Sequence, residues 1–208
     1  MATLDNDYWD ERYRQGATTW DIGKISSPLK AYFEQLTDKG VPILIPGCGN
    51  GYEAGWLLEN GFSDLTLIDI SEELTGRLKE KFSAYTTQPP ALSAYTSPPL
   101  TIITGDFFQL QGEYGLIIEQ TFFCALDPSL RPLYVEKMHG LLKPGGNLAG
   151  LLFDREFASG PPFGGHRDEY AELLSAKFTI HCLEPCYNSI PPRAGTELFF
   201  IAGKRTDL

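Results

Sequence analysis

Short runs of aliphatic and β-branched residues alternate with longer amphipathic stretches from about residue 41 onward. The short runs are bounded by turn residues, which is typical of buried strands. We expect seven strands, at residues 41–45, 64–70, 100–104, 114–119, 147–153, 179–183 and 198–202. We expect helices between them at residues 52–60, 71–82, 128–142 and 167–178. This alternation predicts an α/β fold, a doubly wound and mostly parallel sheet with helices on both faces.

The ends of the chain depart from this alternation. No helical stretch separates the last two strands, so we expect them to pair as an antiparallel C-terminal hairpin. Two amphipathic stretches, at residues 8–15 and 27–36, precede the first strand and predict N-terminal helices that cover the ligand edge of the sheet. Residues 83–99 are rich in proline and predict a long loop, either an insertion or a lid. We therefore expect one domain over residues 1–208, with a cover at 1–40 and a core at 41–208.

Two short segments of the core predict sharp boundaries. The turn at residues 143–146 should end the helix at 128–142 before the next strand starts at residue 147. The helix at 167–178 should run directly into the first strand of the hairpin.

Composition narrows the class of protein. The 208 residues carry 17 basic and 27 acidic side chains, a formal net charge of −10, and the isoelectric point is near 4.7. An acidic chain without a basic run is not expected to bind nucleic acid or an anionic membrane surface. The N-terminus has no apolar core and does not resemble a secretory signal. We expect a cytoplasmic monomer that acts on a small-molecule substrate.

The four cysteines are too few for a disulfide scaffold at this length, which favours a reducing compartment. Cys182 and Cys186, with His181, could form half of a metal site. A second pair of ligands is missing, so we expect no metal.

A glycine-rich turn carries the first candidate chemistry. Gly47, Gly49 and Gly51 follow the first strand and open a helix, where glycines permit a tight turn and close approach of a ligand to the backbone. Asp69 ends the next strand, where a carboxylate can accept hydrogen bonds from ribose hydroxyls. Together these features predict a site for an adenosine-containing ligand at the carboxyl ends of the strands.

Two adenosine cofactors compete for this site. A dinucleotide fingerprint requires a third glycine at position 52, which is Tyr52 here, and no P-loop lysine follows the turn. S-adenosylmethionine carries no phosphate, so the pattern fits it better than a nicotinamide dinucleotide. An oxidoreductase remains the alternative from another enzyme class, and a non-catalytic sensor of an adenosine ligand is a third hypothesis.

Further polar and aromatic residues are placed at the same edge. Asp106 and Phe107 follow the third strand and could contact an adenine ring through its amino group and its face. Trp9, Tyr13 and Trp20 precede the first strand, so they are less readily explained as core. Their rings would attract a sulfonium by about 0.5–2 kcal/mol.

Several motifs resemble those of the thiopurine S-methyltransferase-like family, including its thiol, halide and thiocyanate branch. The resemblance covers nearly the whole chain and therefore implies a Rossmann-like methyltransferase fold. Its motifs are W-D-E-R-Y at 9–13, G-A-T-T-W-D at 16–21, L-I-P-G-C-G at 44–49, F-F-C-A at 122–125, R-P at 131–132, L-L-K-P-G-G at 141–146, and G-P-P-F at 160–163 followed by His166.

The resemblance implies the site residues and the cofactor S-adenosylmethionine. The cofactor contacts that it implies, with the turn glycine Gly49, are Trp9, Tyr13, Trp20, Gly47, Asp69, Asp106, Phe107 and Gln120. Tyr13 stands where the plant branch has Trp. Gln120 stands where the thiopurine branch has Arg and the plant branch Tyr, and Phe153 lies near the position of a Tyr in the halide-methylating branch.

These differences favour a small thiol as methyl acceptor over a halide or a thiopurine, and the acidic net charge disfavours the anions thiocyanate and halide. We expect an apolar acceptor site formed by Phe122, Phe123, Phe153 and Phe163, with Arg155 either stabilising an incoming anion or pairing at the surface. A thiol with a pKa near 8.5 is partly ionised at neutral pH, so the transfer requires no dedicated general base and none is assigned.

Overall fold

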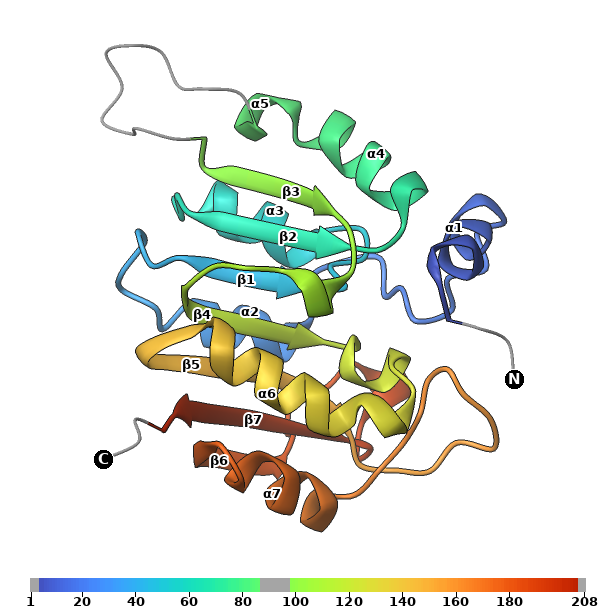
Figure 1. The fold of residues 1–208 in the computed structure, drawn as a ribbon, viewed down its shortest axis with the longest axis vertical. Helices are drawn as coiled ribbons and strands as arrows, with labels where there is room; N and C mark the ends of the chain where they lie inside the picture. The colour runs from blue at the N-terminus through green and yellow to red at the C-terminus, as the bar shows by residue number, and fades with distance from the viewer. Residues whose placement is uncertain (1–3, 87–97, 206–208) are drawn as a thin grey trace.

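The computed structural model describes residues 4–86 and 98–205, and its centre is one seven-stranded sheet (Figure 1). The strands are β1 (Ile43–Pro46), β2 (Leu65–Asp69), β3 (Leu100–Thr104), β4 (Tyr114–Gln120), β5 (Leu142–Phe153), β6 (Phe178–Pro185) and β7 (Glu197–Lys204). Their order across the sheet is β3-β2-β1-β4-β5-β7-β6. The first five strands pair in parallel, and β7 pairs antiparallel with both β5 and β6. The predicted fold class and C-terminal hairpin are confirmed.

Helices cover both faces of this sheet (Figure 1). The α-helices are α1 (Asn6–Arg14), α2 (Ser27–Phe33), α3 (Tyr52–Glu59), α4 (Glu72–Lys81), α5 (Ser83–Thr86), α6 (Arg131–Leu141) and α7 (Arg167–Ser175). The short 3-10 helices are η1 (Phe107–Gln109), η2 (Phe123–Ala125), η3 (Pro128–Leu130) and η4 (Pro191–Arg193). Among the described residues, no helix has the length and apolar character needed to span a bilayer.

Two hydrophobic cores follow from the alternation of side chains along the strands. In β1, Leu44 belongs to the core beneath α6 and α7, while Ile43 and Ile45 belong to the core beneath α2, α3 and α4. Both faces of a parallel strand are covered, which is why its sequence is a continuous apolar run.

The strand order reverses at β1, which has β2 on one side and β4 on the other. Ligands of open parallel sheets bind in the crevice outside the carboxyl ends of the strands at such a point. The glycine-rich turn after β1 lies here.

The two N-terminal helices occupy different places. α1 lies beyond the carboxyl ends of β2 and β3, beside α4, as predicted (Figure 1). The prediction that 27–36 also covers this edge is wrong. α2 packs on the face of the sheet beside α3, because Leu29 and Phe33 are apolar side chains fully buried in that core.

Three boundaries differ from the prediction. The turn at 143–146 does not separate helix and strand: β5 starts at Leu142, which pairs with Tyr114, and the segment bulges before Asn147 pairs with Leu116. Phe178 belongs to β6, because its side chain is fully buried and its backbone pairs with Lys204. Of the loop expected at 83–99, residues 83–86 form the short helix α5, and residues 87–97 lie outside the described residues.

Candidate active site

The turn from β1 into α3 brings backbone into contact with neighbouring elements. Gly47, Gly49 and Gly51 have φ angles of 55°, 50° and 68°, a region that favours glycine. A Cβ at Gly47 would collide with the ring of Phe122. A Cβ at Gly49 would meet nothing within 4 Å, so a ligand can approach the backbone there. The turn therefore forms an open cradle bounded by an aromatic ring.

Asp69 lies at the carboxyl end of β2 and is 9% exposed. Its Oδ1 accepts the Ser71 N–H at 3.0 Å. Burial, and to a lesser extent the charge of Asp10, raise its pKa to about 6, although backbone N–H groups oppose the shift. A buried carboxylate at this edge is suited to accept hydrogen bonds from ligand hydroxyls.

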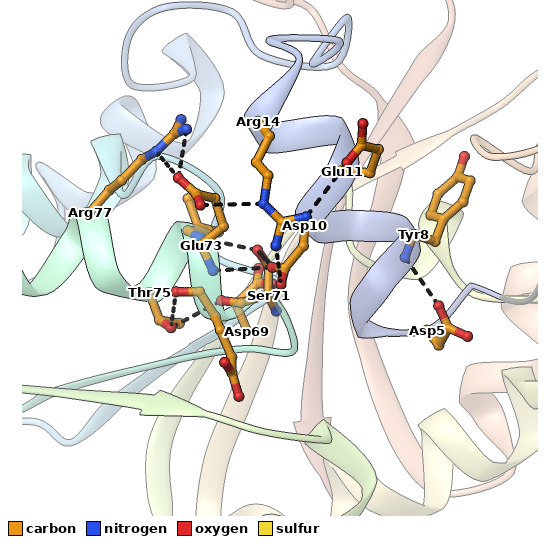
Figure 2. A network of polar contacts seen from close by, with 12 residues as sticks. Asp5, Tyr8, Asp10, Glu11, Arg14, Asp69, Ser71, Glu73, Thr75 and Arg77 are labelled. Carbon is orange, nitrogen blue, oxygen red and sulfur yellow. Dashed lines mark hydrogen bonds and ion pairs between the residues drawn. The ribbon is translucent and has the colours of Figure 1, made fainter.

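Asp10 docks α1 against the first turn of α4 (Figure 2). Its Oδ1 accepts the hydroxyl of Ser71 at 2.5 Å and the N–H of Glu73 at 3.1 Å. Asp10 is buried, with 5% of the residue exposed. Ser71 in turn caps α4 by accepting the N–H of Leu74. A carboxylate at a helix N-terminus is favoured by the helix dipole.

Arginine side chains surround this contact. Arg14 lies 3.3 Å from Asp10 and 3.6 Å from Glu73, and Glu73 also pairs with Arg77 at 2.8 Å (Figure 2). α1 is thus fixed beside Asp69 by polar contacts.

The three N-terminal aromatic residues gather as one cluster. The rings of Trp9 and Tyr13 meet that of Trp20 edge to face, with centroids 5.6 and 5.9 Å away. Tyr13 is nevertheless part of the core and is 6% exposed. Burial, followed by the nearby charge of Asp69, raises the pKa of the Tyr13 phenol, so it stays protonated.

Asp106 and Phe107 extend this edge to β3. Asp106 is exposed and caps η1 by accepting the Phe108 N–H at 2.8 Å. Phe107 is 5% exposed, and its ring packs edge to face on Phe122 with centroids 5.2 Å apart. The preceding Gly105 is open, because a Cβ there would meet nothing within 4 Å.

The carboxyl end of β4 closes the other side of the cradle. Gln120 is half-buried, and within residues 4–86 and 98–205 no group donates a hydrogen bond to its buried Oε1. Thr121 follows with a φ angle of 62°, unusual for a β-branched residue. Phe122 then turns its ring toward Gly47.

The residues expected to bind the acceptor differ in their burial. Phe153 is half-buried and Phe163 lies on the following loop, where its N–H donates to the Cys124 carbonyl at 2.6 Å. Phe123 is 3% exposed and packs between Tyr134 and Tyr170 in the core, so it does not reach the open edge.

Arg155 is exposed and its guanidinium lies over the ring of Phe157, 4.6 Å from the centroid. Arg155 was expected either to stabilise an incoming anion or to pair at the surface, and among the described residues it forms no ion pair with an acidic side chain. The arginine instead belongs to the exposed loop after β5.

Arg193 is a residue that the sequence did not indicate. Its side chain is 11% exposed, donates to the Trp20 carbonyl at 2.7 Å and pairs with the buried Glu197 at 3.3 Å. Its guanidinium also lies 5.4 Å from the centroid of Phe153. Because Trp20 is 173 residues away in the chain, no local pattern could have revealed this connection between the N-terminal cover and η4.

Cys182 and Cys186 were considered as half of a possible metal site, and the structure defines their surroundings. All four cysteines are free. Over the described ranges, no group of three or more His, Cys, Asp or Glu side chains could hold a metal ion. The thiol of Cys182 faces the Phe199 carbonyl and that of Cys186 faces Asn188.

Comparison with known proteins gives consistent matches. The sequence profile of the thiopurine S-methyltransferase family matches residues 4–198. A probable thiol methyltransferase 2 of Arabidopsis thaliana is 35% identical over 84% of this chain and 74% of its own length. A thiopurine S-methyltransferase of Pseudomonas fluorescens is 26% identical over 87% of both chains. A thiocyanate methyltransferase 1 of Brassica oleracea is 28% identical over 94% of this chain and 84% of its own.

Solved structures agree in fold. Magnesium protoporphyrin IX methyltransferase from Synechocystis, with bound S-adenosylhomocysteine, superposes with a TM-score of 0.71 at 16% identity, over 96% of this chain and 97% of its own. A Burkholderia thailandensis N-methyltransferase, with 1,6-didemethyltoxoflavin and the same product bound, gives 0.69 at 19% identity, over 97% and 87%.

Proposed function

We propose, from the premise that the chain belongs to the thiopurine S-methyltransferase family and is an S-adenosylmethionine-dependent methyltransferase, that its methyl acceptor is a small thiol. The observation that carries the choice is the pair Gln120 and Phe153 at the carboxyl ends of β4 and β5. Neither side chain supplies the cation or the hydroxyl that would hold a halide or a thiopurine. The family membership also removes the nicotinamide-dependent alternative.

The cradle fits the cofactor in three ways. Open space above Gly49 and Gly105 admits a ligand to the backbone, and Asp69 can accept two ribose hydroxyls. The Oε1 of Gln120, which has no donor among the residues that the structure describes, can accept a hydrogen bond from the ligand. Trp9, Tyr13 and Trp20 would cover it from the N-terminal side, and Asp106 and Phe107 would bound the adenine end. When bound, the cofactor supplies a methyl group on a positively charged sulfur.

The chain's own residues then orient and shield. The aromatic cluster would exclude water and favour positive charge by about 0.5–2 kcal/mol. In-line approach of a nucleophile depends mainly on orientation, which the fixed turn after β1 and the wall after β4 provide. Phe153 and Phe163 offer an apolar approach for the acceptor, and a thiol ionised in part at neutral pH reacts without a general base. No residue is assigned as a general base.

The acceptor is tested by offering a panel of small thiols, thiocyanate, iodide and a thiopurine with S-adenosylmethionine. We expect methylated thiols in the headspace or extract, with kcat/KM for the best thiol at least tenfold above that for thiocyanate or iodide. Preference for an anion would overturn the thiol assignment. Binding of S-adenosylhomocysteine by calorimetry without any methylated product would instead favour a sensor.

We further propose that the enzyme works in the cytoplasm as a monomer. Four free cysteines suit a reducing compartment. Among the described residues the exposed large hydrophobic side chains are Leu133 and Tyr187, which do not form a broad apolar patch. Light scattering on the purified protein checks the oligomeric state; a dimer mass would contradict the second part.

A further inference from the structure

We propose that Glu119 is a positioning residue, whose ionised carboxylate holds the turn after β4 against the cofactor cradle and thereby makes cofactor affinity depend on pH. The inference rests on the proposed function, because it concerns the same site. It assigns a role to a buried acid that methyl transfer itself does not use.

Glu119 is fully buried and each of its carboxylate oxygens has partners. Oε1 accepts the N–H groups of Phe122 and Phe123 at 2.7 and 2.9 Å, and Oε2 accepts the hydroxyl of Tyr134 at 2.7 Å. These two N–H groups belong to the start of η2, so the side chain acts as a cap for that helix. Gly150, opposite Glu119 on β5, leaves the required room, because a Cβ there would collide with the Glu119 backbone.

The capped turn is connected directly to the cradle. Thr121 in this turn has a left-handed φ angle, which costs free energy for a β-branched residue. The turn therefore needs contacts from outside to hold it. Phe122 then lies with its ring against Gly47 and edge to face with Phe107. Loosening the two N–H bonds would therefore release the wall that Phe122 and Gln120 form beside the cofactor.

No cation neutralises this carboxylate among the described residues. The titratable groups that face it are the Tyr134 phenol from α6 and the Cys124 thiol from η2. The guanidinium of Arg131 lies over the ring of Phe123 and pairs with Glu169. The guanidinium of Arg193 pairs with Glu197. Tyr170 from α7 packs on Phe123 and donates its hydroxyl to the Phe153 carbonyl.

Within the described part of the chain, neutral donors therefore stabilise the charge. Burial raises the pKa of Glu119 to about 7, although the donors from Phe123, Tyr134 and Phe122 oppose this shift. An ionised acceptor makes stronger hydrogen bonds than a neutral one. Compared with a loosened turn in which the carboxyl stays buried but has lost these N–H bonds, the held turn is therefore favoured by ionisation, above pH 7 more than below it. Compared with the unfolded chain, in which the carboxyl is in water, the same ionisation destabilises the folded protein.

The test measures the Kd of S-adenosylhomocysteine by calorimetry from pH 5.5 to 8.5 for the wild type and E119Q. The amide keeps the shape and the acceptor but cannot ionise. We expect equal affinities at pH 5.5 and about fivefold weaker binding by E119Q at pH 8. A ratio that stays constant across this range would overturn the proposal.

A second variant, Y134F, covers the case in which E119Q does not fold. It removes one donor to the carboxylate and leaves both backbone N–H bonds, so the midpoint of the pH dependence should move upward. An unmoved midpoint would count against Glu119 as the titrating group. Because neither measurement uses a methyl acceptor, failure of the thiol assignment leaves this test intact, and failure of this test leaves the thiol assignment intact.

Discussion

At the scale of single residues, the side chain of Asp69 offers the most direct test of cofactor binding. Its pKa of about 6 lies within the range in which the protein can be studied. Hydroxyl donors from a bound ligand favour the ionised form, so affinity for S-adenosylhomocysteine should fall as the pH decreases through 6. D69N should bind about tenfold more weakly at pH 7.5 and should lose this inflection.

The matched control for this variant is E59Q, because Glu59 is exposed at the end of α3. Calorimetric titrations of both variants between pH 5 and 8 provide the measurement. If D69N retained wild-type affinity and the same pH profile, Asp69 would not contact the cofactor.

Residues differ in how far the sequence could reveal them. Gly47 and Asp69 were predicted because the end of a parallel strand is marked locally, by a glycine turn or by a polar residue after an apolar run. Glu119 also follows an apolar run, at 116–118, but nothing local shows that its carboxylate turns inward to the Phe122 N–H and the Tyr134 hydroxyl. Phe123 was expected at the acceptor, but two adjacent phenylalanines leave open which one faces the core.

At the scale of elements, α1 should be separable from the rest of the fold. Asp10 accepts the hydrogen bonds that join it to α4, with Ser71 and Glu73 as donors, and Arg14 adds an ion pair with Glu73. D10A should loosen α1 and with it Trp9 and Tyr13, so we expect S-adenosylhomocysteine binding to weaken by about tenfold or more, since the lost hydrogen bonds are charge-assisted. The sheet does not depend on these contacts and should keep its far-ultraviolet circular dichroism.

The control is D7A, on the same helix but exposed. Binding is measured by calorimetry and opening of the helix by hydrogen exchange of its amides. Equal binding by D10A and D7A would show that α1 is not needed to hold the cofactor.

Element boundaries were predicted less well than element types, for identifiable reasons. Residues 143–146 have a helix-ending composition, and α6 does end at Leu141, but pairing of Leu142 with Tyr114 extends β5 across the turn. α2 was assigned to the ligand edge because it precedes the sheet. Its two buried apolar residues, Leu29 and Phe33, could equally indicate a sheet-packing helix, and only the neighbouring α3 decides between these places.

At the scale of the whole molecule, the topology was predictable because its rules are general. Alternating strands and helices give a parallel sheet, and two terminal strands without a helix between them give a hairpin. That β7 lies between β5 and β6 could not be derived from the sequence. This insertion brings η4 and Arg193 to the site, where the arginine meets Trp20. The missed part of the site thus follows from the missed part of the topology.

Buried acids should also set how the stability of the molecule depends on pH. Burial raises the folded-state pKa of Glu119 from 4.5 to about 7 and of Asp69 from 3.8 to about 6, and raises that of Glu53 as well. Between about pH 4 and 7 the folded protein therefore binds protons that the unfolded chain has released. The free energy of unfolding must decrease as the pH rises through this window.

We expect the free energy of unfolding to fall by about 4 kcal/mol between pH 5 and 8, with Glu119 as the larger contributor. Urea unfolding at each pH measures it, and E119Q should flatten the curve by more than half. Repulsion within a chain of net charge −10 acts in the same direction, but salt screens surface charges more than buried ones. The difference in slope between the wild type and E119Q should therefore persist in about 0.5 M potassium chloride, a salt concentration that screens surface charges over a short distance. A stability that rises from pH 5 to 8, or an E119Q slope equal to that of the wild type, would mean that these carboxyls are already ionised in the folded protein.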